Sequence, residues 1–196
     1  MEQIVIEVSA RHCHLSQKDL NTLFGVNYEL TFKKAMSQTG QFAAQEIVTL
    51  RTETGEINNL RILGPVREKT QIELSMTDAR KLGIKPPLRL SGDLRGSVGG
   101  TVIGPKGTVR IKEGIIIAKR HIHCDLVMAK KMSLTEKSLI SVKTPGNRSV
   151  IFEDVEVRIN KNFKFFMHID TDEGNASLPD GVCSKGQIII TTIKNG

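Results

Sequence analysis

Short runs rich in valine, isoleucine and threonine recur along almost the whole chain, with glycine, proline and asparagine turns between them. Such runs are typical of β-strands, and their close spacing favours barrels or sandwiches over a parallel α/β sheet. Turn signals such as ETGE, GPKG and TPGN separate them. The clearest runs are QIVIEVS, EIVTLRT, NLRILG, TQIELS, GTVRIK, GIIIAK, SLISVKT, VEVRIN, FKFFMHI and QIIITTI. We therefore expect a mainly β protein.

Helices are expected to be few and short. The clearest is residues 15–25, where Ser16 is a good N-cap and an apolar face follows at helical spacing. Residues 77–84 allow a turn or two with Thr77 as the cap, and residues 124–134 repeat the first pattern. So little helix excludes a stack of helical repeats.

A weak internal repeat divides the chain. Each half contains a strand, the tetrapeptide R-H-x-H, a capped helix and a strand series that ends near a Thr-Asp pair. We expect two tandem related β-barrels capped by short α-helices, the first in residues 1–110 and the second in residues 111–196. The N-terminal strand could pair within its own half or exchange into the second barrel, and both arrangements remain open.

The two R-H-x-H segments, residues 11–14 and 120–123, hold four of the five histidines in the chain. Side chains two apart on a strand point to the same face, so both imidazoles of each pair can bind one metal ion. Zinc accepts histidine nitrogens and usually takes a third protein ligand. His168 can complete one site, and a carboxylate such as Glu46 or Glu73 must complete the other. A coordination position left open would make such a site catalytic.

The net charge of +7, from 28 basic and 21 acidic side chains, attracts polyanions. Lysines and arginines are scattered, and one tyrosine with no tryptophan offers little surface for stacking bases. A small phosphate-rich ligand is therefore favoured over nucleic acid. Arg67 follows a Gly-Pro turn, and its guanidinium fork matches phosphate oxygens. The alternative for Arg67 is a solvated surface side chain.

The three cysteines are odd in number and lack C-x-x-C spacing, which favours a reducing compartment over a disulfide framework. By strand alternation Cys13 lies on the face opposite His12 and His14, so we assign it to packing. No apolar run is long enough to span a membrane, and the N-terminus lacks the pattern of a secretion signal.

Taken together, VSARHCHLS, GQFAAQE, GPVREKTQIELSMTDA, AKRHIHCD and MHIDTDEGNA resemble the PduL-type phosphate acyltransferases, also called phosphate propanoyltransferases. The match extends over nearly the whole chain in the right order. The resemblance implies tandem β-barrels, two zinc ions, and interconversion of short-chain acyl-CoA (acetyl or propanoyl) plus phosphate with acyl phosphate plus CoA. For this reaction we hypothesise direct attack on the thioester carbonyl by phosphate held by zinc and Arg67.

The resemblance also implies roles for individual residues. Arg67 would bind phosphate as the catalytic arginine. One zinc, which meets the CoA sulfur, would take His12, His14 and Glu73, and the other would take His121, His123 and His168. The residues expected to line the CoA site are Val8, Ser9, Ala10, Arg61 and Asn175.

Two other functions share these histidines. One is a two-zinc hydrolase of thioesters or phosphoesters, which needs no phosphate co-substrate. The other is a non-enzymatic module with closed structural zinc sites. In every case we expect no nucleic-acid or membrane partner, and a homo-oligomer is possible. Only eleven residues precede His12, without the amphipathic extension of microcompartment-packaged members, so we expect a cytoplasmic protein.

Overall fold

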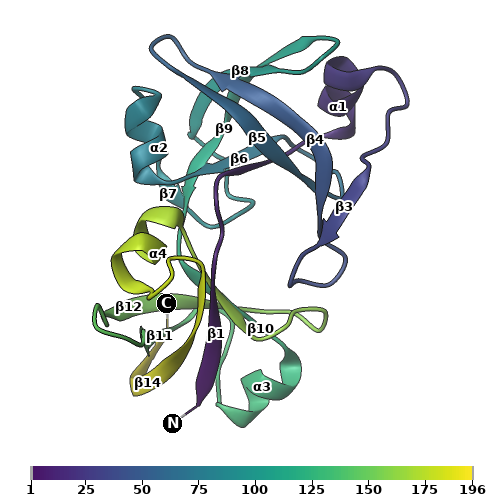
Figure 1. Ribbon diagram of the computed structural model, residues 1–196. Coiled ribbons are helices and arrows are strands. Elements are labelled where there is room, and N and C mark those ends of the chain that lie inside the picture. The colour runs from purple at the N-terminus through teal and green to yellow at the C-terminus, as the bar shows by residue number, and fades with distance from the viewer. Residues whose placement is uncertain (1, 196) are drawn as a thin grey trace. The chain divides into compact units, whose positions relative to one another are not determined.

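The computed structural model describes the backbone of residues 2–195 and the side chains of residues 2–189. These residues form short helices and many strands (Figure 1). The chain divides into two compact units, each with its own sheet and core. We call residues 10–118 the first barrel, and residues 1–9 with 119–196 the second barrel.

In the first barrel six strands close into a ring through their hydrogen-bonded pairs. In order around the ring these are β4 (Phe42–Arg51), β5 (Glu56–Gly64), β2 (His12–His14), β6 (Gln71–Leu74), β9 (Thr108–Ala118) and β8 (Val98–Ile103). Two further strands extend the sheet, β3 (Phe32–Ala35) on β4 and β7 (Leu88–Arg89) on β9. The helices of this unit are α1 (Gln17–Phe24) and α2 (Met76–Lys81).

The second barrel is also a closed ring of six strands. Its order is β1 (Gln3–Val8), β13 (Phe166–Ile169), β10 (His121–Cys124), β12 (Ile151–Ile159), β11 (Ser138–Lys143) and β14 (Cys183–Asn195). Its helices are α3 (Leu126–Lys131) and α4 (Thr171–Ser177). The expected mainly β architecture of two barrels with short helices is therefore confirmed.

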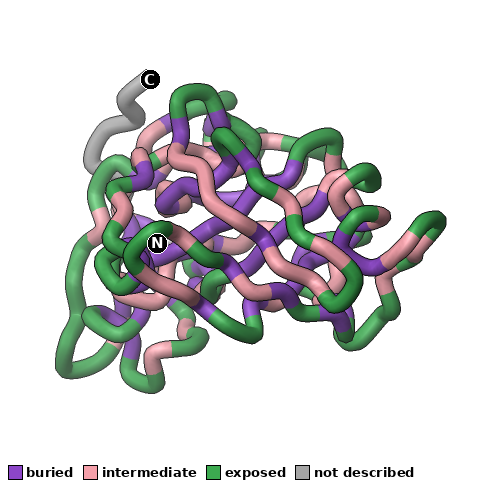
Figure 2. The backbone as a smooth tube through the Cα atoms, turned by 90° about the horizontal axis from the view of Figure 1, so that it is seen from above, coloured by how far each residue is buried: buried purple, intermediate pink, exposed green. Residues whose placement is uncertain are grey.

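Alternation of side chains along the strands builds each core. In β4 the residues Ala44, Glu46, Val48 and Leu50 are buried while their neighbours are mostly exposed or half-buried. Figure 2 shows buried stretches interleaved with exposed ones in this way. Cys13 packs in the core of the first barrel and Cys124 in the core of the second.

The compact units divide the chain at residues 9 and 118. The division expected after residue 110 falls inside β9, which continues through Gly114 because glycine adopts the positive φ of 136° there. The N-terminal strand, for which two arrangements were open, belongs to the second barrel and not to its own half of the sequence. β1 pairs in parallel with β13 and antiparallel with β14, both in the second barrel.

The helix ends follow local capping chemistry. Ser16 Oγ accepts the Asp19 amide at 3.1 Å, and Gly25 ends α1 with a φ of 118°. The expectation that Thr77 caps the next helix is wrong. Ser75 is the N-cap, because its backbone is extended and its Oγ accepts the Asp78 amide at 3.3 Å. None of the helices in residues 2–195 is long and apolar enough to cross a membrane.

Candidate metal centres

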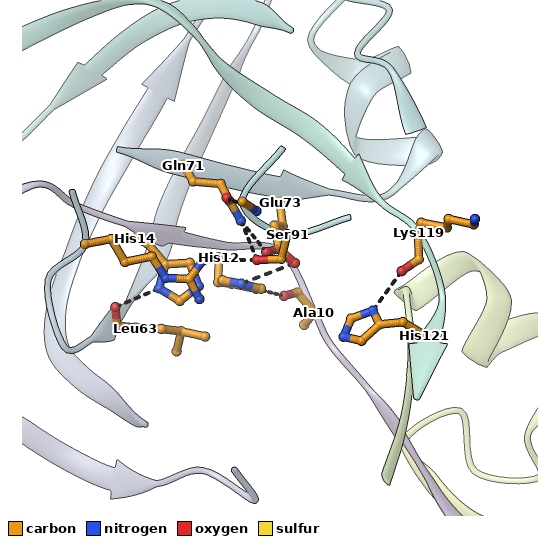
Figure 3. A network of polar contacts seen from close by, with 11 residues as sticks. Ala10, His12, His14, Leu63, Gln71, Glu73, Ser91, Lys119 and His121 are labelled. Carbon is orange, nitrogen blue, oxygen red and sulfur yellow. Dashed lines mark hydrogen bonds and ion pairs between the residues drawn. The ribbon is translucent and has the colours of Figure 1, made fainter. Parts of the chain in front are cut away.

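His12, His14 and Glu73 come together inside the first barrel (Figure 3). The two histidines lie on β2, and Glu73 is the cross-strand partner of His12 on β6. His12 Nε2 lies 3.6 Å from Glu73 Oε2. All three residues are at least nine-tenths buried. Of the two carboxylates considered for this site, Glu73 is the one that lies beside the two histidines. Glu46 instead accepts hydrogen bonds from the Tyr28 hydroxyl and the Thr31 amide.

His121, His123 and His168 form a second group inside the second barrel. Here too the first histidine of the pair faces the third residue across an antiparallel strand pair, β10 with β13. The ring centroids lie 4.7 to 5.6 Å apart. Phe163 packs on the His123 ring at 4.2 Å, and Glu7 Oε2 lies 3.4 Å from His168 Nε2.

Hydrogen bonds orient several of these imidazoles. His12 Nδ1 donates to the Ala10 carbonyl at 2.8 Å, and His121 Nδ1 donates to the Lys119 carbonyl at 2.8 Å. In both cases the acceptor is two residues back. His14 Nδ1 donates to the Leu63 carbonyl at 3.2 Å. Because Nδ1 donates to a carbonyl in each ring, Nε2 is the nitrogen left to bind a metal, as in histidines that bind metals.

The first group is electrostatically coupled. Burial alone would lower the pKa of His12, but the Glu73 carboxylate outweighs burial and raises that pKa. Burial and the positive charges of His12 and Arg67 lower the pKa of His14 to about 3. For Glu73, burial opposes ionisation, yet the two imidazoles hold its pKa well below the usual range. A neutral His14 and an ionised Glu73 are the forms that bind a metal.

Both groups fit zinc by their donor chemistry. Two histidines with a glutamate and three histidines are ligand sets that zinc takes in catalytic sites. In each group the possible ligand atoms lie within 4.8 Å of one another. The fit is therefore supported by donor identity, by burial and by the protonated Nδ1 of three imidazoles.

A partly buried polar network joins Glu73 to Arg67 through Gln71 and Ser91. Figure 3 shows Gln71, Ser91 and Glu73 of this network. Gln71 Nε2 donates to Glu73 Oε1 at 2.5 Å and to Ser91 Oγ at 2.8 Å. Arg67 Nη1 donates to the same Ser91 Oγ at 3.0 Å. Gln71 is 1% exposed, and its side-chain oxygen Oε1 accepts a hydrogen bond from the Gly92 amide. Arg67 also lines a pocket of about 560 Å³ with Lys69 and Arg95.

The residues expected to bind CoA lie in both compact units. In the first barrel, Ala10 precedes β2, and Arg61 donates to the carbonyls of Ala44 and Gln45. In the second barrel, Val8 ends β1 and Ser9 donates its amide to the Ile169 carbonyl. Asn175 lies on α4, where it lines a pocket of about 410 Å³ with Arg148.

The cysteines next to the histidine pairs are poor nucleophiles. Cys13 is fully buried, and burial raises the pKa of its thiol far above the ordinary value. Burial and the Asp125 carboxylate raise the pKa of the Cys124 thiol to about 11. Both side chains belong to the hydrophobic cores.

Sequence reasoning missed Gln71, Ser91 and Glu7, because no local motif marks a residue that supports a metal ligand from a neighbouring strand or loop. The alternation of TQIELS was the one available signal, since it places Gln71 on the same face as Glu73.

Comparison with known proteins extends this description. A family model described as phosphate propanoyltransferase matches residues 5–179. A phosphate propanoyltransferase of Thermotoga maritima is 48% identical over 176 residues, which cover 89% of this chain and 84% of the relative. One from Listeria monocytogenes is 43% identical over 190 residues, covering 96% of this chain and 88% of the relative. The two histidine groups and the Arg67 network thus occur in a chain that belongs to the phosphate propanoyltransferase family.

Proposed function

We propose that this chain is a zinc-dependent phosphate acyltransferase that interconverts short-chain acyl-CoA and phosphate with acyl phosphate and CoA. Membership of the phosphate propanoyltransferase family supports the reaction. The observation that carries the proposal further is the Arg67–Ser91–Gln71–Glu73 network. It connects a guanidinium suited to phosphate with a carboxylate of a metal-binding group.

Each barrel would hold one zinc ion. His12, His14 and Glu73 would bind the first, and His121, His123 and His168 the second. When bound, zinc supplies positive charge that polarises an acyl oxygen and stabilises a departing thiolate. The protein shields the first group from bulk water, since its three residues are at most 7% exposed. A dry environment strengthens each charge interaction made there.

The transfer itself would be direct. Arg67 binds phosphate and orients one oxygen toward the thioester carbonyl carbon. That oxygen forms the new C–O bond, the C–S bond breaks, and the CoA sulfur leaves with the electron pair. Holding both reactants in one site removes most of the entropic cost of their encounter. No side chain is acylated, in agreement with the buried and protonated thiol of Cys13.

Contacts to CoA are proposed for Val8, Ser9, Ala10, Arg61 and Asn175. Packing in the second barrel supports three of these assignments. A Cβ on Gly174 would lie 2.4 Å from Val8 Cγ2, so α4 approaches the end of β1 closely. Val8, Ser9 and Asn175 therefore belong to one neighbourhood. Backbone amides and the Asn175 amide offer hydrogen bonds there.

The decisive experiment follows the loss of thioester absorbance from acetyl-CoA and propanoyl-CoA, with and without phosphate, in protein whose zinc content has been measured. Loss only with phosphate supports acyl transfer. Equal loss without phosphate would make the protein a thioester hydrolase and would remove the assigned role of Arg67. No loss with either substrate in zinc-loaded protein would instead favour a binding module.

A further inference from the structure

We infer that the arginine before each H-x-H pair is a positioning residue that holds the third metal ligand of its barrel against the two histidines. It does so through an ion pair with the helix that follows that ligand. The inference rests on the metal sites of the proposed function and assigns a role to Arg11 and Arg120, which do not belong to either ligand set.

In the first barrel the partner of Arg11 is Asp78. Arg11 Nη1 lies 3.0 Å from Asp78 Oδ1, and the aspartate side chain is only 10% exposed. Arg11 directly precedes His12, and Asp78 comes five residues after Glu73. The ion pair therefore joins the strand of the two histidines to the helix that follows their carboxylate partner.

In the second barrel the same relationship recurs with a different acid. Arg120 Nη1 lies 2.8 Å from Glu173 Oε1. Arg120 directly precedes His121, and Glu173 comes five residues after His168. The offsets of one and five residues are identical in the two barrels, although the third ligand and the acid both differ in type.

The acid is rigidly connected to the third ligand. Ser75 and Asp170 are the N-caps of α2 and α4, and each stands two residues after the ligand. The Asp78 amide donates to Ser75 Oγ at 3.3 Å, and the Glu173 amide donates to Asp170 Oδ1 at 2.8 Å. Because cap and first turn form one hydrogen-bonded unit, an arginine that holds the acid also restrains the end of the ligand strand.

Ordinary surface ion pairs look different. Arg51 and Glu56 join neighbouring strands of the first barrel, and their side chains are 58% and 35% exposed. Such pairs contribute little to folding stability because water and salt screen them.

Arg120 has further contacts, since Nη2 donates to the Glu153 carbonyl at 3.1 Å and the guanidinium lies 5.3 Å from the Phe152 ring centre. We expect the stronger effect in the second barrel, because the Arg11 side chain is 48% exposed.

The test uses the full chain and measures zinc affinity by competition with a chromophoric chelator. A His121→Ala background isolates the first zinc site and a His12→Ala background the second. Loss of a partner that orients a metal ligand typically weakens metal binding by about 10- to 100-fold. We expect that loss for Arg11→Gln in the first background and for Arg120→Gln in the second. Arg51→Gln and Lys131→Gln, which remove exposed ion pairs, serve as matched controls and should leave zinc affinity unchanged.

Two readouts separate positioning from general stability. The first is the thermal midpoint of the zinc-free protein, which should change no more for Arg11→Gln and Arg120→Gln than for the controls. The second is Arg11→Lys, which should recover part of the zinc affinity that Arg11→Gln loses. Unchanged zinc affinity in both variants, with two zinc ions in the unmutated chain, would overturn the inference alone. An unmutated chain that takes up no zinc would overturn both the inference and the zinc requirement of the proposed function.

Discussion

Gln71 donates two hydrogen bonds from Nε2, one to Glu73 Oε1 at 2.5 Å and one to Ser91 Oγ at 2.8 Å. This contact occupies one carboxylate oxygen and leaves Glu73 Oε2 on the side of His12. A buried amide thus orients the only carboxylate of the first metal group. The same amide is linked to Arg67 by two hydrogen bonds that share Ser91 Oγ as acceptor.

Replacing Gln71 with leucine should weaken zinc binding in the first barrel by about 10- to 100-fold, because Glu73 loses the donor that fixes its orientation. Zinc competition in the His121→Ala background measures this effect. Gln45→Leu is the control, since the Gln45 side chain is exposed on β4 of the same barrel. Equal zinc affinity in Gln71→Leu and the control would show that Glu73 does not depend on this contact.

Arg67→Ala should raise the KM for phosphate by about 30-fold or more while zinc content stays at its original value, because a charge-assisted bond typically contributes about 2 kcal/mol. Steady-state kinetics at varied phosphate and elemental analysis measure the two quantities. Arg67→Lys should retain part of the phosphate affinity, since the charge remains without the fork. A phosphate dependence that does not change in Arg67→Ala would remove Arg67 from the site.

Cys13→Ser should retain most of its turnover per bound zinc, because the thiol is buried in the core and its raised pKa keeps it protonated. A hydroxyl in this apolar position should lower the free energy of unfolding by about 1–3 kcal/mol. Turnover and chemical denaturation are the measurements. Abolished turnover with normal zinc content would contradict direct transfer and indicate a covalent acyl-enzyme. Cys124→Ser, in the other core, is the matched variant.

His121→Ala should lower the metal content by about one zinc per chain, because two ligands rarely retain the ion when three are needed. His12→Ala should have the same effect through the other group, and the double variant should lose both ions. Elemental analysis of dialysed protein measures the stoichiometry. Full metal content in the double variant would refute both ligand assignments.

Gly174→Ala should destabilise the second barrel. Alanine in place of a helical glycine ordinarily stabilises by about 1 kcal/mol. Here the new Cβ would lie 2.4 Å from Val8 Cγ2, and such overpacking costs about 1–3 kcal/mol. Urea denaturation gives the free energy of unfolding. Adding Val8→Ala should recover part of the loss, and a stabilised Gly174→Ala would contradict the close packing of α4 on β1.

Several features of this molecule could be read from local patterns. The alternation of apolar residues predicted most of the strands, because burial on one face repeats every second residue. GTVRIK and GIIIAK are parts of one strand, β9, since Gly114 bends the chain without ending it. Helix α4 was not predicted, although Asp170 and Glu173 form a capping box there. Its middle contains Gly174 and Asn175, and both residue types weaken the helical signal.

The candidate histidine ligands could be predicted from the sequence because the H-x-H spacing fixes their relative geometry on a strand. Two imidazoles separated by one residue share a strand face wherever that strand lies. The choice between Glu46 and Glu73 could not be made in the same way, because it depends on which strand pairs with β2 and in which register. A shift of one residue in that pairing would turn Glu73 to the opposite face.

Spacing along the chain was thus enough to predict most of the strands, the histidine pairs and the cap of α1, since each of these depends on residues that are near in sequence. Long-range pairing was needed to place β1 in the second barrel, to bring Gln71 and Ser91 between Arg67 and Glu73, and to join Arg11 with Asp78 and Arg120 with Glu173. These contacts join residues far apart in the chain, as between Glu7 and His168, which are 161 positions apart. Closure of each sheet into a ring brings such residues together, and no local pattern specifies which strands become neighbours.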